Sequence, residues 1–67
     1  MSTLEEVELW PDELEAIKLH DVDGLDQVSA AEKMKVSQST FARVLDKAYK
    51  KMAEGIIFGK AIRILKK

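Results

Sequence analysis

The chain has 67 residues, 46% of them hydrophobic and 34% charged, a balance typical of one small globular domain and not of a disordered segment. It contains no Cys and a single His, which excludes a disulfide framework and a thiolate zinc site and argues against a histidine-based metal centre. The longest aliphatic and aromatic run, 56–58, is too short to span a membrane, and the acidic N-terminus lacks the pattern of a signal peptide. We therefore expect a cytoplasmic protein.

The net charge of −1 conceals a division of charge along the chain. Residues 1–32 carry ten acids and one base, whereas residues 33–67 carry ten bases and two acids. Such an asymmetry indicates that the C-terminal half binds nucleic acid or another acidic partner. The alternative is that the two halves pair with each other inside one fold. The charges alone do not decide between these two hypotheses.

The first two elements are predicted from alternation and from a proline. Val7 and Leu9 alternate with glutamates, which favours a short strand over 4–10. Pro11 suits the first position of a helix, where its missing N–H costs nothing, so we expect a helix over 11–21. The apolar positions expected to face the core are Leu14 and Ile17, continued by Leu19 or Val22.

Two further helices are predicted from residues that can cap them. Asp26 is a good N-cap for a helix over 27–34, and Ser37 for a longer helix over 38–54 that Gly55 can end. The inner positions expected in the shorter helix are Val28, Ala31 and Met34. In the longer helix an apolar stripe at helical spacing comprises Phe41, Val44, Leu45, Ala48 and Met52.

The chain ends with a second predicted strand, over 60–65, in which Ile62 and Ile64 alternate with Arg63. Its charges are basic and those of the first strand are acidic, so we expect the two strands to pair antiparallel. A two-stranded ribbon is marginal alone and must lie on the helices or pair across a dimer. The predicted fold is a mainly α, three-helix helix-turn-helix domain over 1–67, with a short two-stranded β-ribbon from the chain ends.

Residues 27–45 have the features of a helix-turn-helix. Ala31 is a small residue where the two helices cross, Val36 anchors the turn, and Phe41 seats the second helix. Short polar and basic side chains at the start of the second helix can reach base edges and phosphates. We therefore expect helix 38–54 to read the major groove of double-stranded DNA as part of a transcriptional regulator. The DNA-binding residues predicted are Ser37, Gln38, Ser39, Thr40, Ala42, Arg43, Lys47 and Lys50.

The alternative function is a protein-interaction module that docks on RNA polymerase or another regulator, because an acidic first half would repel DNA unless it faces away. We expect no enzyme, since no pair of groups supports acid–base or nucleophilic chemistry, and we expect no cofactor or metal. The chain also has more apolar side chains than three short helices readily cover, which predicts a homodimer. These side chains are Val7, Leu9, Ile56, Ile57, Phe58, Ile62 and Ile64.

Three single side chains are assigned structural roles. We expect His20 on the surface near the end of the first helix, where the negative end of the helix dipole favours it. Trp10 is expected to pack beside Pro11, and Tyr49 to lie on the helix surface or at the edge of the core.

Most of the chain carries motifs shared with one known family. They include Asp12-Glu13-Leu14-Glu15-Ala16, Ala30-Ala31-Glu32, Val36-Ser37, Ser39-Thr40-Phe41, Arg43-Val44-Leu45 and Gly59-Lys60-Ala61. On these residues the chain resembles a small prokaryotic family of predicted DNA-binding proteins of unknown function (domain-of-unknown-function family 134). The helix-turn-helix of that family is similar to sigma-70 region four. The resemblance implies a DNA-binding regulator without enzymatic activity.

Several positions depart from that family. Lys35 stands where the family usually carries Gly, in a position that often needs a positive φ, and a Lys there would cost about 1 kcal/mol. Gln38 replaces an arginine near the start of the recognition helix, and Trp10 stands where a Ser or Thr cap is common. Members also typically carry a basic, cysteine-containing N-terminal segment that this sequence lacks, which we expect to lower the affinity for DNA more than the stability of the fold.

Overall fold

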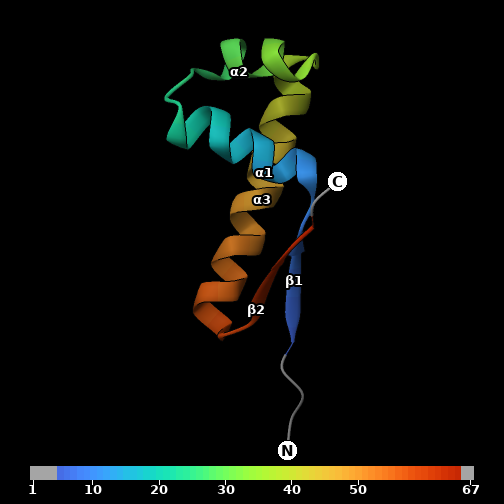
Figure 1. The fold of residues 1–67 in the computed structure, drawn as a ribbon, viewed down its shortest axis with the longest axis vertical. Helices are drawn as coiled ribbons and strands as arrows, with labels where there is room; N and C mark the ends of the chain where they lie inside the picture. The colour runs from blue at the N-terminus through green and yellow to red at the C-terminus, as the bar shows by residue number, and fades with distance from the viewer. Residues whose placement is uncertain (1–4, 66–67) are drawn as a thin grey trace, which may run out of the picture.

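The structure is a computed structural model that describes residues 5–65, and it is mainly helical with a small two-stranded sheet, as predicted. The elements in chain order are β1 (Glu6–Leu9), α1 (Pro11–Ile17), the π-helical segment η1 (Lys18–Val22), α2 (Gln27–Met34), α3 (Gln38–Phe58) and β2 (Ala61–Ile64). Figure 1 shows α3 as the long axis of the molecule, with α2 beside its start, α1 crossing it nearer the middle, and the β-ribbon beside its second half. No helix within residues 5–65 is long and apolar enough to cross a membrane.

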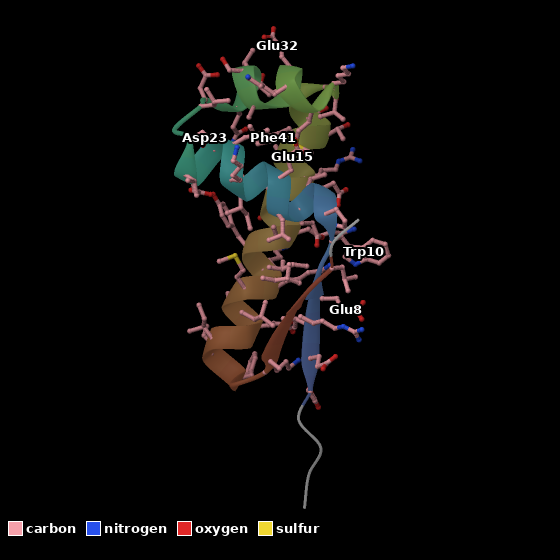
Figure 2. All side chains as sticks on the ribbon, in the orientation of Figure 1. Glu8, Trp10, Glu15, Asp23, Glu32 and Phe41 are labelled. Carbon is pink, nitrogen blue, oxygen red and sulfur yellow. The ribbon has the colours of Figure 1, made fainter. Side chains whose placement is uncertain are left out.

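The hydrophobic core lies where α1, η1 and α2 meet the first half of α3. Phe41 is fully buried at its centre and Leu45 is almost so, which confirms the predicted orientation of α3 (Figure 2). The other buried members are Ala16, Leu19, Ala30 and Ala31. The three alanines let the helices approach the Phe41 ring closely. Burying such a ring stabilises the fold by about 1.5–3 kcal/mol.

The first helix differs from its prediction in shape and in the face that it buries. The chain is helical from Pro11, but it becomes π-helical from Lys18. Leu14 and Ile17 are only half-buried, and Val22 is exposed. Leu19 is buried, which confirms one of the predicted alternatives, and the other buried positions are Glu13 and Ala16.

His20 is not the surface residue expected from the sequence. It is half-buried, its Nδ1 lies 2.8 Å from the carbonyl oxygen of Leu25, and its ring meets that of Phe41 edge-on with the centroids 6.5 Å apart. The imidazole therefore links η1 to the loop before α2. Tyr49 links α3 to η1, because its hydroxyl donates a hydrogen bond to the carboxylate of Asp21. Partial removal from water, that hydrogen bond and the carboxylate charge raise the pKa of Tyr49 to about 12.

The predicted end of α3 at Gly55 is wrong. The helix continues for one more turn to Phe58, and Gly59 ends it in a left-handed conformation with φ of 67°. Gly55 is buried inside the helix, and a Cβ there would lie 2.7 Å from Cγ1 of Ile62. Because Gly55 has no side chain, β2 can pack closely against α3 at this point.

The predicted antiparallel ribbon is also wrong, because β1 and β2 run parallel, with Val7 opposite Ile62 and Leu9 opposite Ile64. β1 leads directly into α1, while β2 follows the far end of α3, so both strands run back along that helix (Figure 1). The strands are shorter than the predicted ranges 4–10 and 60–65, and residue 4 lies outside the described residues. Val7 and Leu9 are buried within the chain, so they are not free to cover a dimer interface as the sequence suggested.

Candidate nucleic-acid interface

α2 is positioned by its N-cap and by two alanines. The carboxylate of Asp26 accepts a hydrogen bond of 2.7 Å from the backbone N–H of Ser29, and this bond lowers the pKa of Asp26. Ala30 and Ala31 are buried where α2 crosses the core, which confirms Ala31 as the small residue at the crossing. Val28, expected on the inner face, is exposed instead, because the alanines take the inward positions.

The turn between α2 and α3 is closed by a left-handed residue. Lys35 has φ of 60° and ψ of 43°, the conformation that the resemblance led us to expect at this position. Its N–H donates to the carbonyl oxygen of Glu32 at 3.1 Å, and the N–H of Val36 donates to that of Ala31 at 3.0 Å. These bonds fix the angle at which α3 leaves the turn.

Replacing Lys35 by Gly is expected to stabilise the fold by about 0.5–1 kcal/mol. A left-handed conformation costs a residue with a side chain about 1–2 kcal/mol, and the greater freedom of Gly in the unfolded chain offsets part of that gain. Urea unfolding measures the change. Lys33→Gly, inside α2, is the matched control and should destabilise by about 1 kcal/mol. Equal losses for both variants would contradict the left-handed assignment.

The start of α3 is capped by its own hydroxyl groups. Oγ of Ser37 accepts a hydrogen bond of 3.2 Å from the backbone N–H of Thr40 and donates one of 3.0 Å to Oγ1 of Thr40. Oγ of Ser39 lies 3.3 Å from Oγ of Ser37. These side chains therefore hold the first turn of the helix. Phe41 anchors the same turn in the core. The orientation of the opposite side of α3, which carries Arg43, Asp46, Lys47 and Lys50 and which we call its polar face, is therefore fixed.

The predicted DNA-binding residues lie on the first half of α3 and its N-cap, and Arg43, Lys47 and Lys50 share one face of the helix. All are exposed except Ala42, which is half-buried: Ser37, Gln38, Ser39, Thr40, Ala42, Arg43, Lys47 and Lys50. Sequence reasoning missed Asp46, which lies on the same face and pairs with Lys50 at 3.4 Å. The four-residue spacing of an acid and a base on one helix is the signal that could have found this pair.

The two explanations of the charge asymmetry each hold for part of the chain. Three bases of the second half pair with acids of the first: Lys51 with Glu13 at 2.9 Å, Lys60 with Glu5 at 3.3 Å and Arg63 with Glu6 at 3.9 Å. Within residues 5–65, neither Arg43 nor Lys47 takes part in an ion pair. Lys51, Lys60 and Arg63 are therefore engaged with acids of the first half, while Arg43 and Lys47 remain available to an anion.

Trp10 is not the packing anchor expected from the sequence. Its side chain is 53% exposed, and Figure 2 shows the ring projecting outward where β1 meets α1. Nζ of Lys51 lies 5.9 Å from the centre of the indole ring. The backbone N–H of Trp10 donates to Oε1 of Glu13 at 2.8 Å, so the start of α1 is held by Glu13 instead of by the indole.

A surface hollow lies beside this ring, between the start of α1 and the polar face of α3. Its lining is Trp10, Asp12, Glu13, Val44, Lys47 and Lys51. Because Lys47 belongs to both the hollow and the polar face, the two are continuous. Among the described residues, no group of three His, Asp or Glu side chains could hold a metal ion.

Comparison with known proteins gives a family and no activity. A family model described as "Protein of unknown function DUF134" matches residues 1–67. The chain is 52% identical over 64 residues to a UPF0251 protein of Thermoanaerobacter pseudethanolicus. The matched region covers 96% of this chain and 54% of the relative. A UPF0251 protein of Caldanaerobacter subterraneus is 50% identical over 64 residues, with the same two coverages. The chain thus spans about half the length of these relatives, and no solved structure matches it.

Proposed function

The chain belongs to the DUF134 family, and we propose that this member is a helix-turn-helix regulator that binds double-stranded DNA with the first half of α3 in the major groove. The observation that supports this most is that Arg43 and Lys47 are exposed and make no ion pair within residues 5–65. The two side chains lie one turn apart on one face of α3. An exposed basic face on the second helix of this motif is suited to phosphates and base edges.

Each side chain of the face has a distinct role in the proposal. The amide of Gln38 can pair bidentately with adenine, and the guanidinium of Arg43 with guanine. Lys47 is better suited to a phosphate. From Gln38 to Lys47 the helix rises by about 14 Å, which matches about four base pairs of duplex. The hydroxyls of Ser37 and Thr40 are used in capping and contribute mainly by fixing the helix start.

Replacing Arg43 by Ala is expected to weaken binding to a selected site by about 1–3 kcal/mol, or about 5- to 150-fold, because a bidentate contact to a base is lost. Fluorescence anisotropy with a duplex taken from a selected-site library measures this. Arg63→Ala is the matched control, because it removes the same charge from β2 and should leave affinity nearly unchanged. Equal binding by parent and Arg43→Ala would contradict the role of Arg43.

Replacing Lys47 by Ala is expected to weaken all duplexes alike and to lower the salt slope of binding by about one, since one phosphate contact is lost. The measurement is the same anisotropy titration on random-sequence duplex across a salt series. Lys18→Ala, which removes an exposed base on η1, should leave the slope unchanged. A slope that is the same in all three proteins would place the DNA contacts elsewhere.

A protein-interaction module that docks on RNA polymerase is the second candidate, and Asp46 favours it. A carboxylate on the same face as Arg43 and Lys47 is unfavourable against phosphates but suits a mixed-charge protein surface. The random-duplex titration separates the two candidates. Steeply salt-dependent binding supports the DNA-binding role, whereas no binding at low salt favours the docking role.

A further inference from the structure

The last turns of α3 carry a second apolar face that nothing in residues 5–65 covers. Ile56, Ile57 and Phe58 are 73%, 72% and 68% exposed. The β-ribbon packs on the opposite side of these turns, where Ile62 approaches Gly55 (Figure 1). With 3.6 residues per turn, Ile57 stacks above Ala53 and Tyr49 on the outer side of the helix. We call the surface formed by Ala53, Ile57 and Phe58, which line one hollow, the outer patch. Ile56 is exposed to one side of it.

The outer patch has the shape of a helix-packing site. A shallow hollow in it is lined by Lys50, Ala53, Glu54, Ile57 and Phe58, and the lining is almost entirely apolar. The first four of these residues lie at positions i, i+3, i+4 and i+7 of the helix. Four side chains at this spacing form the hole that receives one side chain of a facing helix in knobs-into-holes packing. The hollow therefore indicates a helix as the occupant.

We propose that the occupant is the outer patch of a second copy of this chain, with the two α3 helices antiparallel about a two-fold axis at Ala53. The small side chain of Ala53 allows close approach at the axis. The antiparallel pairing places Ile57 of each copy beside Tyr49 of the other. Both contacts are made by one surface with itself, as a two-fold interface requires.

Charge complementarity favours a second copy over an unrelated partner. Lys50 and Glu54 lie along the same edge of the outer patch, and a two-fold axis between antiparallel helices brings like edges together. Within one chain Lys50 pairs with Asp46 at 3.4 Å and Glu54 with Lys60 at 3.7 Å, but all four side chains except Lys60 are at least half exposed and can also serve a partner. In the dimer Lys50 of one copy lies within reach of Glu54 of the other, and this contact forms twice. A chain of 67 residues also has a thin core, so burial of Ile57 and Phe58 of each copy on association would stabilise it appreciably.

The dimer takes Lys50 from the polar face of α3 and leaves the rest of that face uncovered. The helix ends at Phe58, so in an antiparallel pairing about Ala53 the end of the second copy lies opposite Ala48. Gln38 to Lys47 extend beyond that point. The inference therefore does not depend on DNA binding, and each proposal can fail without the other.

Sedimentation equilibrium over a concentration series up to the millimolar range tests the proposal. We expect the parent to approach twice its chain mass of 7.6 kDa, and Ile57→Glu and Ala53→Glu to remain monomeric with unchanged helical circular dichroism. Val22→Glu is the matched control, because Val22 is equally exposed at 74% but lies on η1, and it should associate as the parent does. A parent that stays monomeric throughout, or an Ile57→Glu variant that associates normally, overturns the proposal.

Reversal of charge tests the antiparallel arrangement. Lys50→Glu is expected to weaken association by about 5- to 30-fold, because a like charge faces Glu54 at two symmetric places. The double variant Lys50→Glu with Glu54→Lys should recover most of that loss, since the pair is restored in reverse. Equal weakening by the single and the double variant would overturn the two-fold register.

Discussion

Phe41→Ala is expected to leave the chain largely unfolded at room temperature. The ring is fully buried where α1, η1 and α2 meet α3, and its removal creates a cavity that costs about 3–5 kcal/mol. In a chain of this length a single core rarely supplies more than about 3–5 kcal/mol of stability, so this loss removes most or all of it. His20, which meets the ring edge-on, would lose its packing partner at the same time.

Urea unfolding followed by far-ultraviolet circular dichroism measures this effect at low micromolar concentration, where association contributes little. Phe58→Ala is the control: it removes the same ring from an exposed position, and its free energy of unfolding should stay within about 0.5 kcal/mol of the parent's. If Phe41→Ala unfolds at the same urea concentration as the parent, the core has been placed wrongly.

The second large effect is expected at the ion pair between α1 and α3. Oε1 of Glu13 accepts hydrogen bonds from Nζ of Lys51 and from the backbone N–H of Trp10, and the two charged side chains are 5% and 25% exposed. Lys51→Met leaves a buried carboxylate without its counter-charge. We expect a loss of about 2–3 kcal/mol, below the cost for a fully buried pair because Lys51 retains some contact with water.

Two further variants isolate the cause of that loss. Lys50→Met removes the neighbouring, exposed lysine and should change stability by less than about 0.5 kcal/mol. Glu13→Gln combined with Lys51→Met should recover most of the loss, because a neutral amide oxygen still accepts from Trp10. Equal stability of Lys51→Met and Lys50→Met in urea titrations would show that the pair is not buried in solution.

Local signals in the sequence predicted the helix-turn-helix well. Asp26 and Ser37 cap α2 and α3 as expected, so the bounds 27–34 and the start at residue 38 are confirmed. The predictions that were wrong concern features that depend on contacts between residues distant in the sequence. Gly55 is a good helix terminator by composition, but it is retained inside α3 because Ile62 packs on it. The predicted direction of the ribbon was wrong, because the alternation of apolar and charged residues is the same whichever way a strand runs.

The candidate interface was predictable to a similar extent. The buried stripe through Phe41 and Leu45 fixes which side of α3 faces outward, so the exposure of Arg43 and Lys47 could be inferred from spacing alone. The pairing of Lys51 with Glu13 could not be inferred in this way, because no local sequence pattern links two residues in different helices. The outward position of Trp10, whose ring lies beside the same Lys51, was likewise not signalled by any local pattern.

The parallel direction of the ribbon has a mechanical consequence. The chain enters β1 at one end of the ribbon and leaves β2 at the other, so tension between the two ends acts along the strands and in opposite directions. The flanking bonds, Ala61 N–H to the carbonyl oxygen of Glu5 and Leu65 N–H to that of Leu9, then bear load together with the bonds between them. A hairpin would open one bond at a time from its free end, whereas this ribbon must be sheared as a unit. Force transmitted through the domain would therefore meet its greatest resistance at two four-residue strands, while the helix-turn-helix above them stays unloaded.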